Sequence, residues 1–254
     1  MPSRPNHNFG GTSYTSPRVT KRGRPVHASL VRHECLRHCP AVKWLMAAFC
    51  LVASLHAESL VLDGKLKEGW TWRRENPAGW RVRGSTLEIR VEPGNMWGPA
   101  NDAKNVLVRR LDPAHAGPHQ QVQISITISN KPTEQYEQVD LVWYYDDSHM
   151  VKIGQELVDG KLSIVMGREE NDRTRTIAII PLDAVQVDLR LTVTNNIIRG
   201  AFRPTGSKEW REAGACDLPI HGAPQVAIQC YQGPVNTEHW ARISDFTIQR
   251  QPNE

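Results

Sequence analysis

The sequence predicts an all-β fold for residues 58–254, a two-sheet antiparallel β-sandwich or jelly roll. Three observations predict it. Almost every segment from Trp80 onward is a short run rich in β-branched and aromatic residues, often alternating with polar ones. Pro and Gly interrupt these runs at intervals of roughly 8 to 15 residues. No window of about 12 residues or more has the apolar spacing of an amphipathic helix.

The chain begins with a segment that does not fit this fold. Residues 1–42 are rich in Pro, Arg, His, Ser and Thr and predict a disordered basic leader, because they cannot bury enough apolar surface to offset the entropy of ordering. A translation start at Val42 would remove this leader. Residues 43–57 have the pattern of a signal helix with cleavage after Ala57. Their apolar run is shorter than the ~20 residues that span a bilayer, and a buried core helix is the alternative. We therefore expect a secreted or periplasmic protein with no stable membrane span.

The charge of the chain is unevenly divided. The whole sequence has a formal net charge of +4, but eight of its 31 Lys and Arg residues and one of its 27 acidic residues lie in residues 1–57. Residues 58–254 therefore carry a formal net charge of −3. A mildly acidic domain lacks the electrostatic footprint of a nucleic-acid-binding protein, so we expect no nucleic-acid partner.

The cysteine pattern is compatible with export. Cys35, Cys39 and Cys50 belong to the expected leader and signal, which leaves Cys216 and Cys230. A disulfide between these two would close a loop of about 15 residues and add ~3 kcal/mol in the chain-entropy model. Two buried free thiols are the alternative, since a bridge requires Cα atoms within ~7 Å.

The first half of the predicted domain contains several short strands and one long one. Short strands are expected over residues 80–82, 86–91 and 104–110. The long strand covers residues 121–129 and places four apolar side chains on one face: Val122, Ile124, Ile126 and Ile128.

Residues 138–165 form the centre of the predicted sheet, as three strands joined by two tight turns. The first strand directs Leu141 and Trp143 to one side, and Gln138 and Tyr144 to the other, because side chains alternate along a strand. The turns are expected at Asp146-Asp147-Ser148 and at Asp159-Gly160. Aromatic residues on both sides indicate that one face joins a core and the other lines a groove.

The rest of the chain continues this pattern. Strands are expected over residues 174–180, 185–194, 197–202, 226–231 and 241–249. Asn195-Asn196 suits a hairpin turn, because Asn tolerates positive φ. The charged segment 168–173 is expected to be a solvated turn.

A resemblance to a known family supports the predicted β-sandwich. Residues 80–110 resemble the concanavalin-A-like domain at the C-terminus of bacterial β-xylosidases, and related domains of unassigned function. The shared pattern is a Trp, a strand, P-G-x-x-W-G-x-x-N-x-A-x-N, and an apolar strand ending in Arg. The matching positions are Trp80, Pro93, Gly94, Trp97, Gly98, Asn101, Ala103, Asn105 and Arg109.

The resemblance extends over most of residues 66–249, specifically in the first half and more loosely after residue 170. The family pattern Q-x-x-L-x-x-Y-x-D-D followed by V-K-x-G falls on Gln138, Leu141, Tyr144, Asp146, Asp147, Val151, Lys152 and Gly154. The last strand is matched by Ala241, Asp245, Phe246 and Ile248. One departure is Asp140, where the family usually has a small residue.

The resemblance implies a two-sheet jelly roll whose concave face can bind sugars. In the β-xylosidases this domain accompanies a separate catalytic propeller. The expected domain here uses all of residues 58–254, so the resemblance implies no catalytic role and no catalytic residues.

The residues themselves agree with a carbohydrate ligand. Sugars present apolar C–H faces to aromatic rings, and hydroxyl groups to amides and charged groups. If the strand faces converge, Gln138, Tyr144, Lys152 and Glu156 form a compact groove. The ligand-binding candidates are Trp97, Asn101, Gln138, Tyr144, Lys152 and Glu156. Each aromatic among them could instead be core packing, and Trp97 and Asn105 could simply hold a loop against the sheet.

Two other functions remain open. Glycoside hydrolysis needs two carboxylates across the scissile bond, and Asp140 and Glu156 could face one groove from adjacent strands. The E-x-D-x-x-E strand of jelly-roll glucanases is absent from the sequence. The alternative to both sugar functions is a structural or protein-interaction domain that uses its aromatic faces for packing.

No cofactor is expected. The histidines of residues 58–254 lack metal-ligand spacing, and no nucleophile motif or phosphate-binding Gly loop is present. Asp245 could join a structural calcium with backbone carbonyls, although an ordinary strand or turn Asp is the simpler interpretation.

Overall fold

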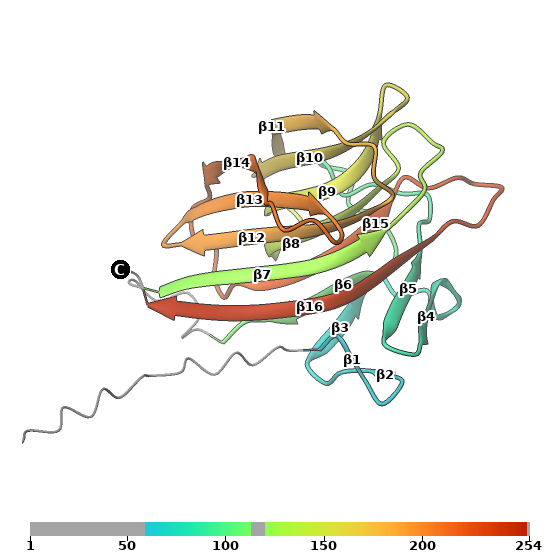
Figure 1. Ribbon diagram of the computed structural model, residues 1–254, viewed down its shortest axis with the longest axis horizontal. Helices are drawn as coiled ribbons and strands as arrows, with labels where there is room; N and C mark the ends of the chain where they lie inside the picture. Colours follow the sequence, from blue (N-terminus) through green and yellow to red (C-terminus); the bar gives the residue numbers. More distant parts are fainter. Residues whose placement is uncertain (1–58, 113–119, 253–254) are drawn as a thin grey trace, which may run out of the picture. The chain divides into compact units, whose positions relative to one another are not determined.

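Two seven-stranded antiparallel sheets stack to form the body of the protein (Figure 1). The structure is a computed structural model that describes residues 59–112 and 120–252. Within these ranges the only helical element is the 3-10 turn η1 (Pro77–Gly79). The predicted all-β sandwich is therefore confirmed, while the leader over 1–42 and the signal over 43–57 lie outside the described residues.

The first sheet has the strand order β11-β10-β9-β8-β15-β6-β3. Its strands are β3 (Trp70–Arg73), β6 (Val106–Arg110), β8 (Gln138–Asp146), β9 (His149–Val158), β10 (Lys161–Glu170), β11 (Arg173–Pro181) and β15 (Gln225–Tyr231). Strands β8 to β11 are consecutive hairpins, so the central stretch of the sequence builds the central and outer part of this sheet.

The second sheet has the order β14-β13-β12-β7-β16-β5-β4. Its strands are β4 (Trp80–Arg83), β5 (Thr86–Arg90), β7 (Gln120–Ser129), β12 (Gln186–Thr194), β13 (Ile197–Pro204), β14 (Arg211–Asp217) and β16 (Trp240–Pro252). A separate hairpin joins β1 (Val61–Leu62) to β2 (Lys65–Leu66).

The main core lies between the sheets and follows from period-two alternation. β8 contributes Leu141 and Trp143, which are at most 2% exposed, and β12 contributes Leu189 and Leu191. These strands face one another across the interior. Each fully buried aliphatic or aromatic side chain stabilises the fold by about 1.5–3 kcal/mol relative to an exposed one. Trp143 and Tyr145 both belong to this core.

The outer face of the first sheet carries a second, smaller apolar cluster. Val142 and Tyr144 from β8 and Tyr231 from β15 pack there beneath residues 93–105, hereafter the covering loop. The loop contributes Met96 and Ala103 to the cluster. Part of this face is thus closed by the loop, and the rest remains open over β9 to β11.

The two cysteines in the described part of the chain are free thiols. Cys216 lies on β14 and Cys230 on β15, which belong to different sheets, and both side chains are buried in the main core. Of the two alternatives left open by the sequence, the structure has the unbridged pair and not the disulfide.

Two other features concern segments considered above. Segment 168–173 is not a solvated turn throughout: β10 continues to Glu170, β11 starts at Arg173, and Glu169 is fully buried. Asp245 lies at a bulge in β16, where its carboxylate accepts a hydrogen bond from Ser244 Oγ. Within the described ranges, no helix has the length and apolarity required to cross a membrane.

Candidate functional site

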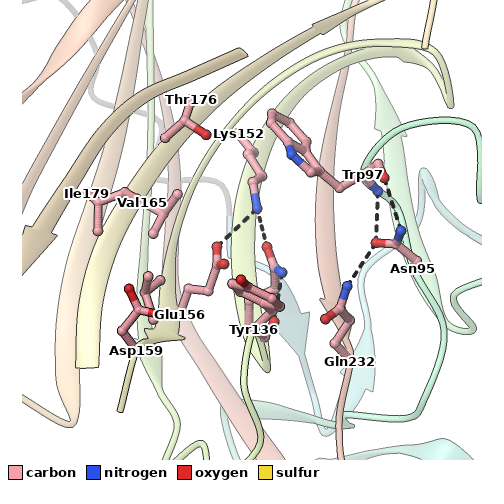
Figure 2. Close-up of a pocket in the computed structure, with 12 residues that line it drawn as sticks. Asn95, Trp97, Tyr136, Lys152, Glu156, Asp159, Val165, Thr176, Ile179 and Gln232 are labelled. Carbon is pink, nitrogen blue, oxygen red and sulfur yellow. Dashed lines mark hydrogen bonds and ion pairs between the residues drawn. The ribbon is translucent and has the colours of Figure 1, made fainter. Parts of the chain in front are cut away.

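A pocket of about 500 Å³ opens on the outer face of the first sheet, beside the covering loop. Figure 2 shows its walls, which come from the loop, from β8 to β11 and from the connections at their ends. The residues that line it are Asn95, Trp97, Tyr136, Gln138, Lys152, Glu156, Val158, Asp159, Val165, Thr176, Ile179 and Gln232. Four of the six residues predicted to bind a ligand are among them: Trp97, Gln138, Lys152 and Glu156.

The register of β8 and β9 explains why these side chains meet. Gln138 pairs with Glu156 and Val142 pairs with Lys152, so the polar side chains of both strands project from the same face. The Lys152 ammonium lies 3.3 Å from Glu156 Oε2 and also donates to the Gln138 side-chain carbonyl. The floor of the pocket is therefore a hydrogen-bonded network of Gln138, Lys152 and Glu156.

Lys152 also reaches below the pocket floor. Its Nζ lies 3.6 Å from Asp140 Oδ2 and donates to the Tyr231 hydroxyl at 3.3 Å. Lys152 is 2% exposed and Asp140 is fully buried. Because this buried ammonium contacts two carboxylates, removing one of these charges would leave another buried charge uncompensated.

Asp140 is the buried end of this network. Burial raises the pKa of its carboxyl to about 6, against the opposing effect of the Lys152 charge. Space for the carboxylate exists because its partner on β9 is Gly154, where any Cβ would overlap Asp140 Oδ1. Asp140 does not line the pocket, so this unusual acid is part of the support beneath it.

Trp97 forms the wall of the pocket on the side of the covering loop. Its ring lies against Gly167 of β10, where a Cβ would overlap the ring atom Cη2. The Lys152 ammonium is 4.9 Å from the ring centroid, within cation–π range. The ring is only partly buried, so part of it remains available at the pocket.

The conformation of the covering loop depends on Asn95 and on the motif residue Gly94. The Asn95 side-chain carbonyl accepts hydrogen bonds from the backbone N–H groups of Met96 and Trp97. Gly94 has φ of +127°, and a Cβ there would lie 2.9 Å from the Cα of Ala103 on the returning arm. Asn95 and Gly94 therefore set the loop conformation that positions Trp97.

Other residues fasten the loop to the rest of the domain. The Arg74 guanidinium donates to the Ala103 carbonyl at 2.7 Å and pairs with Asp147 at 2.8 Å. Asn105 is fully buried and accepts a hydrogen bond from the Asn76 backbone at 2.7 Å. Asn105 therefore holds the loop, as the alternative interpretation of the motif proposed.

Tyr144 and Asn101 do not join the pocket. Tyr144 shares the sheet face of Lys152, but it is fully buried beneath the covering loop and its hydroxyl donates to Asp147. Asn101 lies in the loop and is not among the residues that line the pocket. The strand faces were thus predicted correctly, but the part of the face that stays open was not.

Glu169 connects β10 to the covering loop. Its Oε2 accepts a hydrogen bond from the backbone N–H of Gly98 at 3.0 Å. Burial raises the pKa of the carboxyl to about 7, with the nearby charges of Asp172 and Asp147 acting in the same direction and that of Lys152 against it.

A pH-dependent stability follows from this raised pKa. Between its ordinary pKa of 4.5 and about 7, Glu169 holds its proton more tightly in the folded protein than in the unfolded chain. The free energy of unfolding should therefore fall as pH rises through this window. We expect Glu169→Gln to reduce the fall measured by urea denaturation between pH 5 and pH 8, whereas the exposed Glu209→Gln should not. Parallel pH profiles for Glu169→Gln and the unchanged protein would contradict this role.

Tyr136 was missed by the sequence analysis. It lies just before β8 at the pocket rim, its side chain is 47% exposed, and its φ is +68°. Positive φ is unusual for a bulky residue and costs free energy. The conformation is held by a hydrogen bond from the Tyr136 N–H to the Leu157 carbonyl at 2.8 Å. An isolated aromatic between polar residues gives no signal in a strand pattern, so only the structure could identify it.

Comparison with solved structures supports the fold. A GH43 protein from Bacillus licheniformis, BlXynB, matches with a TM-score of 0.63 and 17% identity, over 75% of this chain and 38% of that one. The Bacteroides ovatus xyloglucan PUL protein GH43B matches with a TM-score of 0.60 and 17% identity, over 77% of this chain and 38% of that one. The chain thus corresponds to well under half the length of these two proteins.

A third similar structure is nearly as short as the matched region. A functionally unknown protein from Saccharomyces cerevisiae matches with a TM-score of 0.57 and 13% identity, over 72% of this chain and 97% of that one. Among curated protein sequences, none matches this chain. A family model described as the β-xylosidase C-terminal concanavalin A-like domain matches residues 63–229, more than half of the chain. The chain therefore belongs to the family of β-xylosidase C-terminal concanavalin A-like domains.

Proposed function

We propose that this domain binds carbohydrate, without cleaving it, in the pocket on the outer face of the first sheet. The observation that carries the proposal is the convergence of an aromatic ring and a polar network on one opening: Trp97 on one side, and Gln138, Lys152 and Glu156 on the floor. Tyr136 adds a second, exposed ring at the rim. Aromatic faces suit sugar C–H groups, and amide, ammonium and carboxylate groups suit sugar hydroxyls.

The family supports this choice of ligand. Its description names β-xylosidases, and the similar structures include proteins described as GH43 and as xyloglucan-related. Because these matches extend over only part of the longer proteins, the activity of the whole relatives does not pass to this chain. What this pocket could provide is contacts with a sugar.

The carboxylate arrangement favours binding over hydrolysis. Glycosidases place two carboxyl groups on opposite sides of the bond to be cleaved. Here Asp140 is fully buried beneath Gly154, and both Asp140 and Glu156 contact the same Lys152 ammonium. A sugar in the pocket would meet Glu156 but not Asp140, so the pair cannot flank a glycosidic bond.

Tyr136→Asn tests the site without damaging the fold. We expect the affinity for the bound glycan to fall about tenfold, the equivalent of ~1.4 kcal/mol, because a stacking surface is lost. The melting temperature should stay the same or rise, because Asn tolerates the positive φ that Tyr136 adopts. The measurements are glycan-array screening of the purified protein, followed by calorimetric titration and thermal unfolding of both forms.

The control is Leu62→Asn, which replaces another exposed large residue, 57% exposed, outside the pocket lining. This variant should bind as the unchanged protein does. An array with no bound glycan would contradict the proposal and favour the protein-interaction alternative. Release of shortened glycans during the titration would favour hydrolysis.

A further inference from the structure

A second pocket, of about 530 Å³, adjoins the first one. Its lining residues come from the start of the covering loop, from the connection before β8 and from the loop after β15. They include Glu134, Gln135, Gln232, Val235, Asn236 and Thr237. This pocket lies outside the polar network of Lys152.

The same segments of the chain line both pockets. Gln232 lines both of them. Gln135 lines the second pocket, and the next residue, Tyr136, lines the first. Likewise, Gly94 lines the second pocket and Asn95 lines the first. Three separate segments therefore run from one pocket into the other, which places the pockets end to end and not on distant surfaces.

The boundary between the pockets is held by specific contacts. The Gln232 backbone N–H donates to the Gly94 carbonyl at 3.2 Å, and its side-chain amide donates to Asn95 Oδ1 at 3.2 Å (Figure 2). The next residue is Gly233, and a Cβ at that position would overlap the Val91 carbonyl. The loop after β15 is thus fixed against the start of the covering loop.

Backbone strain is concentrated at this boundary. Among the described residues other than glycine, ten have positive φ. Seven of these are Asn or Asp, for which the conformation is common in turns, and Tyr136 and Gln232 are two of the remaining three. Strained backbone tends to persist where it serves a function, and here both strained residues line the pockets, Tyr136 the first and Gln232 both.

The charges of the lining residues point to a neutral ligand. Lys152 is the one cation among the described residues that line either pocket, and it already contacts Glu156, Asp140 and Gln138. The acids that line the pockets are Glu134, Glu156 and Asp159. An anionic ligand would meet this negative excess without a free cation to pair with.

We propose that the two pockets form one groove that binds a linear, neutral oligosaccharide, with the second pocket holding sugar units beyond those at Tyr136. This inference rests on the proposed function of the first pocket. Each pocket has by itself the volume of a small-molecule site, ~300–1,000 Å³, so the pair suits a chain of several sugars. The exposed apolar side chain of Val235 and the amide of Asn236 supply an apolar contact and a hydrogen-bonding group in the second pocket.

The test measures affinity against ligand length. Xylo-oligosaccharides and cello-oligosaccharides of two to six units are titrated calorimetrically into the purified protein. We expect affinity to rise at least tenfold between the disaccharide and the hexasaccharide in the better series. The double variant Val235→Ser/Asn236→Ala should lose most of that rise while binding the disaccharide as before.

The control and the remaining outcomes separate the two proposals. Ile220→Ser changes a comparably exposed aliphatic side chain, 63% against 75% for Val235, and should keep the full dependence on length. Equal affinity for all lengths, or an unchanged rise in the double variant, would overturn the extended groove but leave the first pocket as a sugar site. Tighter binding of oligogalacturonates would overturn the neutral ligand. Binding of no saccharide at all would overturn the proposed function itself.

Discussion

Replacing Lys152 with methionine is expected to lower the free energy of unfolding by about 3–5 kcal/mol, because it leaves buried carboxylates without their counter-charge. Lys152 is 2% exposed and lies within 4 Å of both Asp140 and Glu156. Domains of this size are stable by only about 5–15 kcal/mol, so the variant should be close to the limit of folding. Urea denaturation at neutral pH measures the effect.

The loss in Lys152→Met should also depend on pH. The Lys152 charge opposes the effect of burial on Asp140, so its removal should raise the pKa of Asp140 further above about 6. The folded variant then holds the Asp140 proton over a wider range, and its stability should fall more steeply as pH rises. We expect the destabilisation to be smaller at pH 5 than at pH 8, and Asp140→Asn to restore part of the stability of Lys152→Met. The exposed Lys161→Met is the matched control, with a change below about 0.5 kcal/mol. An equally small change in both variants would refute the role of the network.

Gly154→Ala is expected to lower the stability by about 3 kcal/mol or more, because there is no room for even one methyl group. The added Cβ would overlap Asp140 Oδ1 and would lie 2.5 Å from the Val139 backbone carbonyl. The second contact is with backbone of the adjacent strand, so a change of side-chain rotamer cannot relieve it, and β8 and β9 would have to separate. Thermal unfolding of the variant measures the loss.

Gly160→Ala gives the comparison for Gly154→Ala. Gly160 lies in the turn between β9 and β10, where a Cβ would meet open space but φ is +72°. Its replacement should therefore cost only the conformational strain, about 1 kcal/mol. If the two alanine variants lose similar stability, the close packing of Asp140 against Gly154 does not limit the fold.

Most of the strands could be predicted from the sequence because their side chains alternate. The long strands β7, β8, β9 and β12 begin and end within about two residues of the expected limits. The short strands β1, β2 and β3 and the weakly apolar β14 were not predicted, since two to four residues carry no period, and β14 has a Gly and three charged residues. Glu169 was placed in a turn because a run of charges normally faces solvent, and only the covering loop makes its burial possible.

The site could be predicted as far as the strands determine it. Gln138, Lys152 and Glu156 share one face because of the β8–β9 register, which the alternation and the turn residues indicate. The covering loop determines which part of that face remains open. Its path over the sheet is set by contacts between residues far apart in sequence, such as the ion pair of Asp147 with Arg74, which in turn holds the loop. Tyr144 was therefore predicted to bind ligand although the loop buries it, and Tyr136 was not predicted although it stays exposed.

The most direct test of the central claim is a crystal structure of the protein soaked with the glycan that binds most tightly on the array. We expect a sugar ring on the outer face of the first sheet, within contact of Tyr136 or Trp97 and hydrogen-bonded to Gln138, Lys152 or Glu156. Further sugar units should extend past Gln232 toward Val235. A sugar bound on the second sheet, with the pocket beside the covering loop empty, would contradict the proposed carbohydrate site.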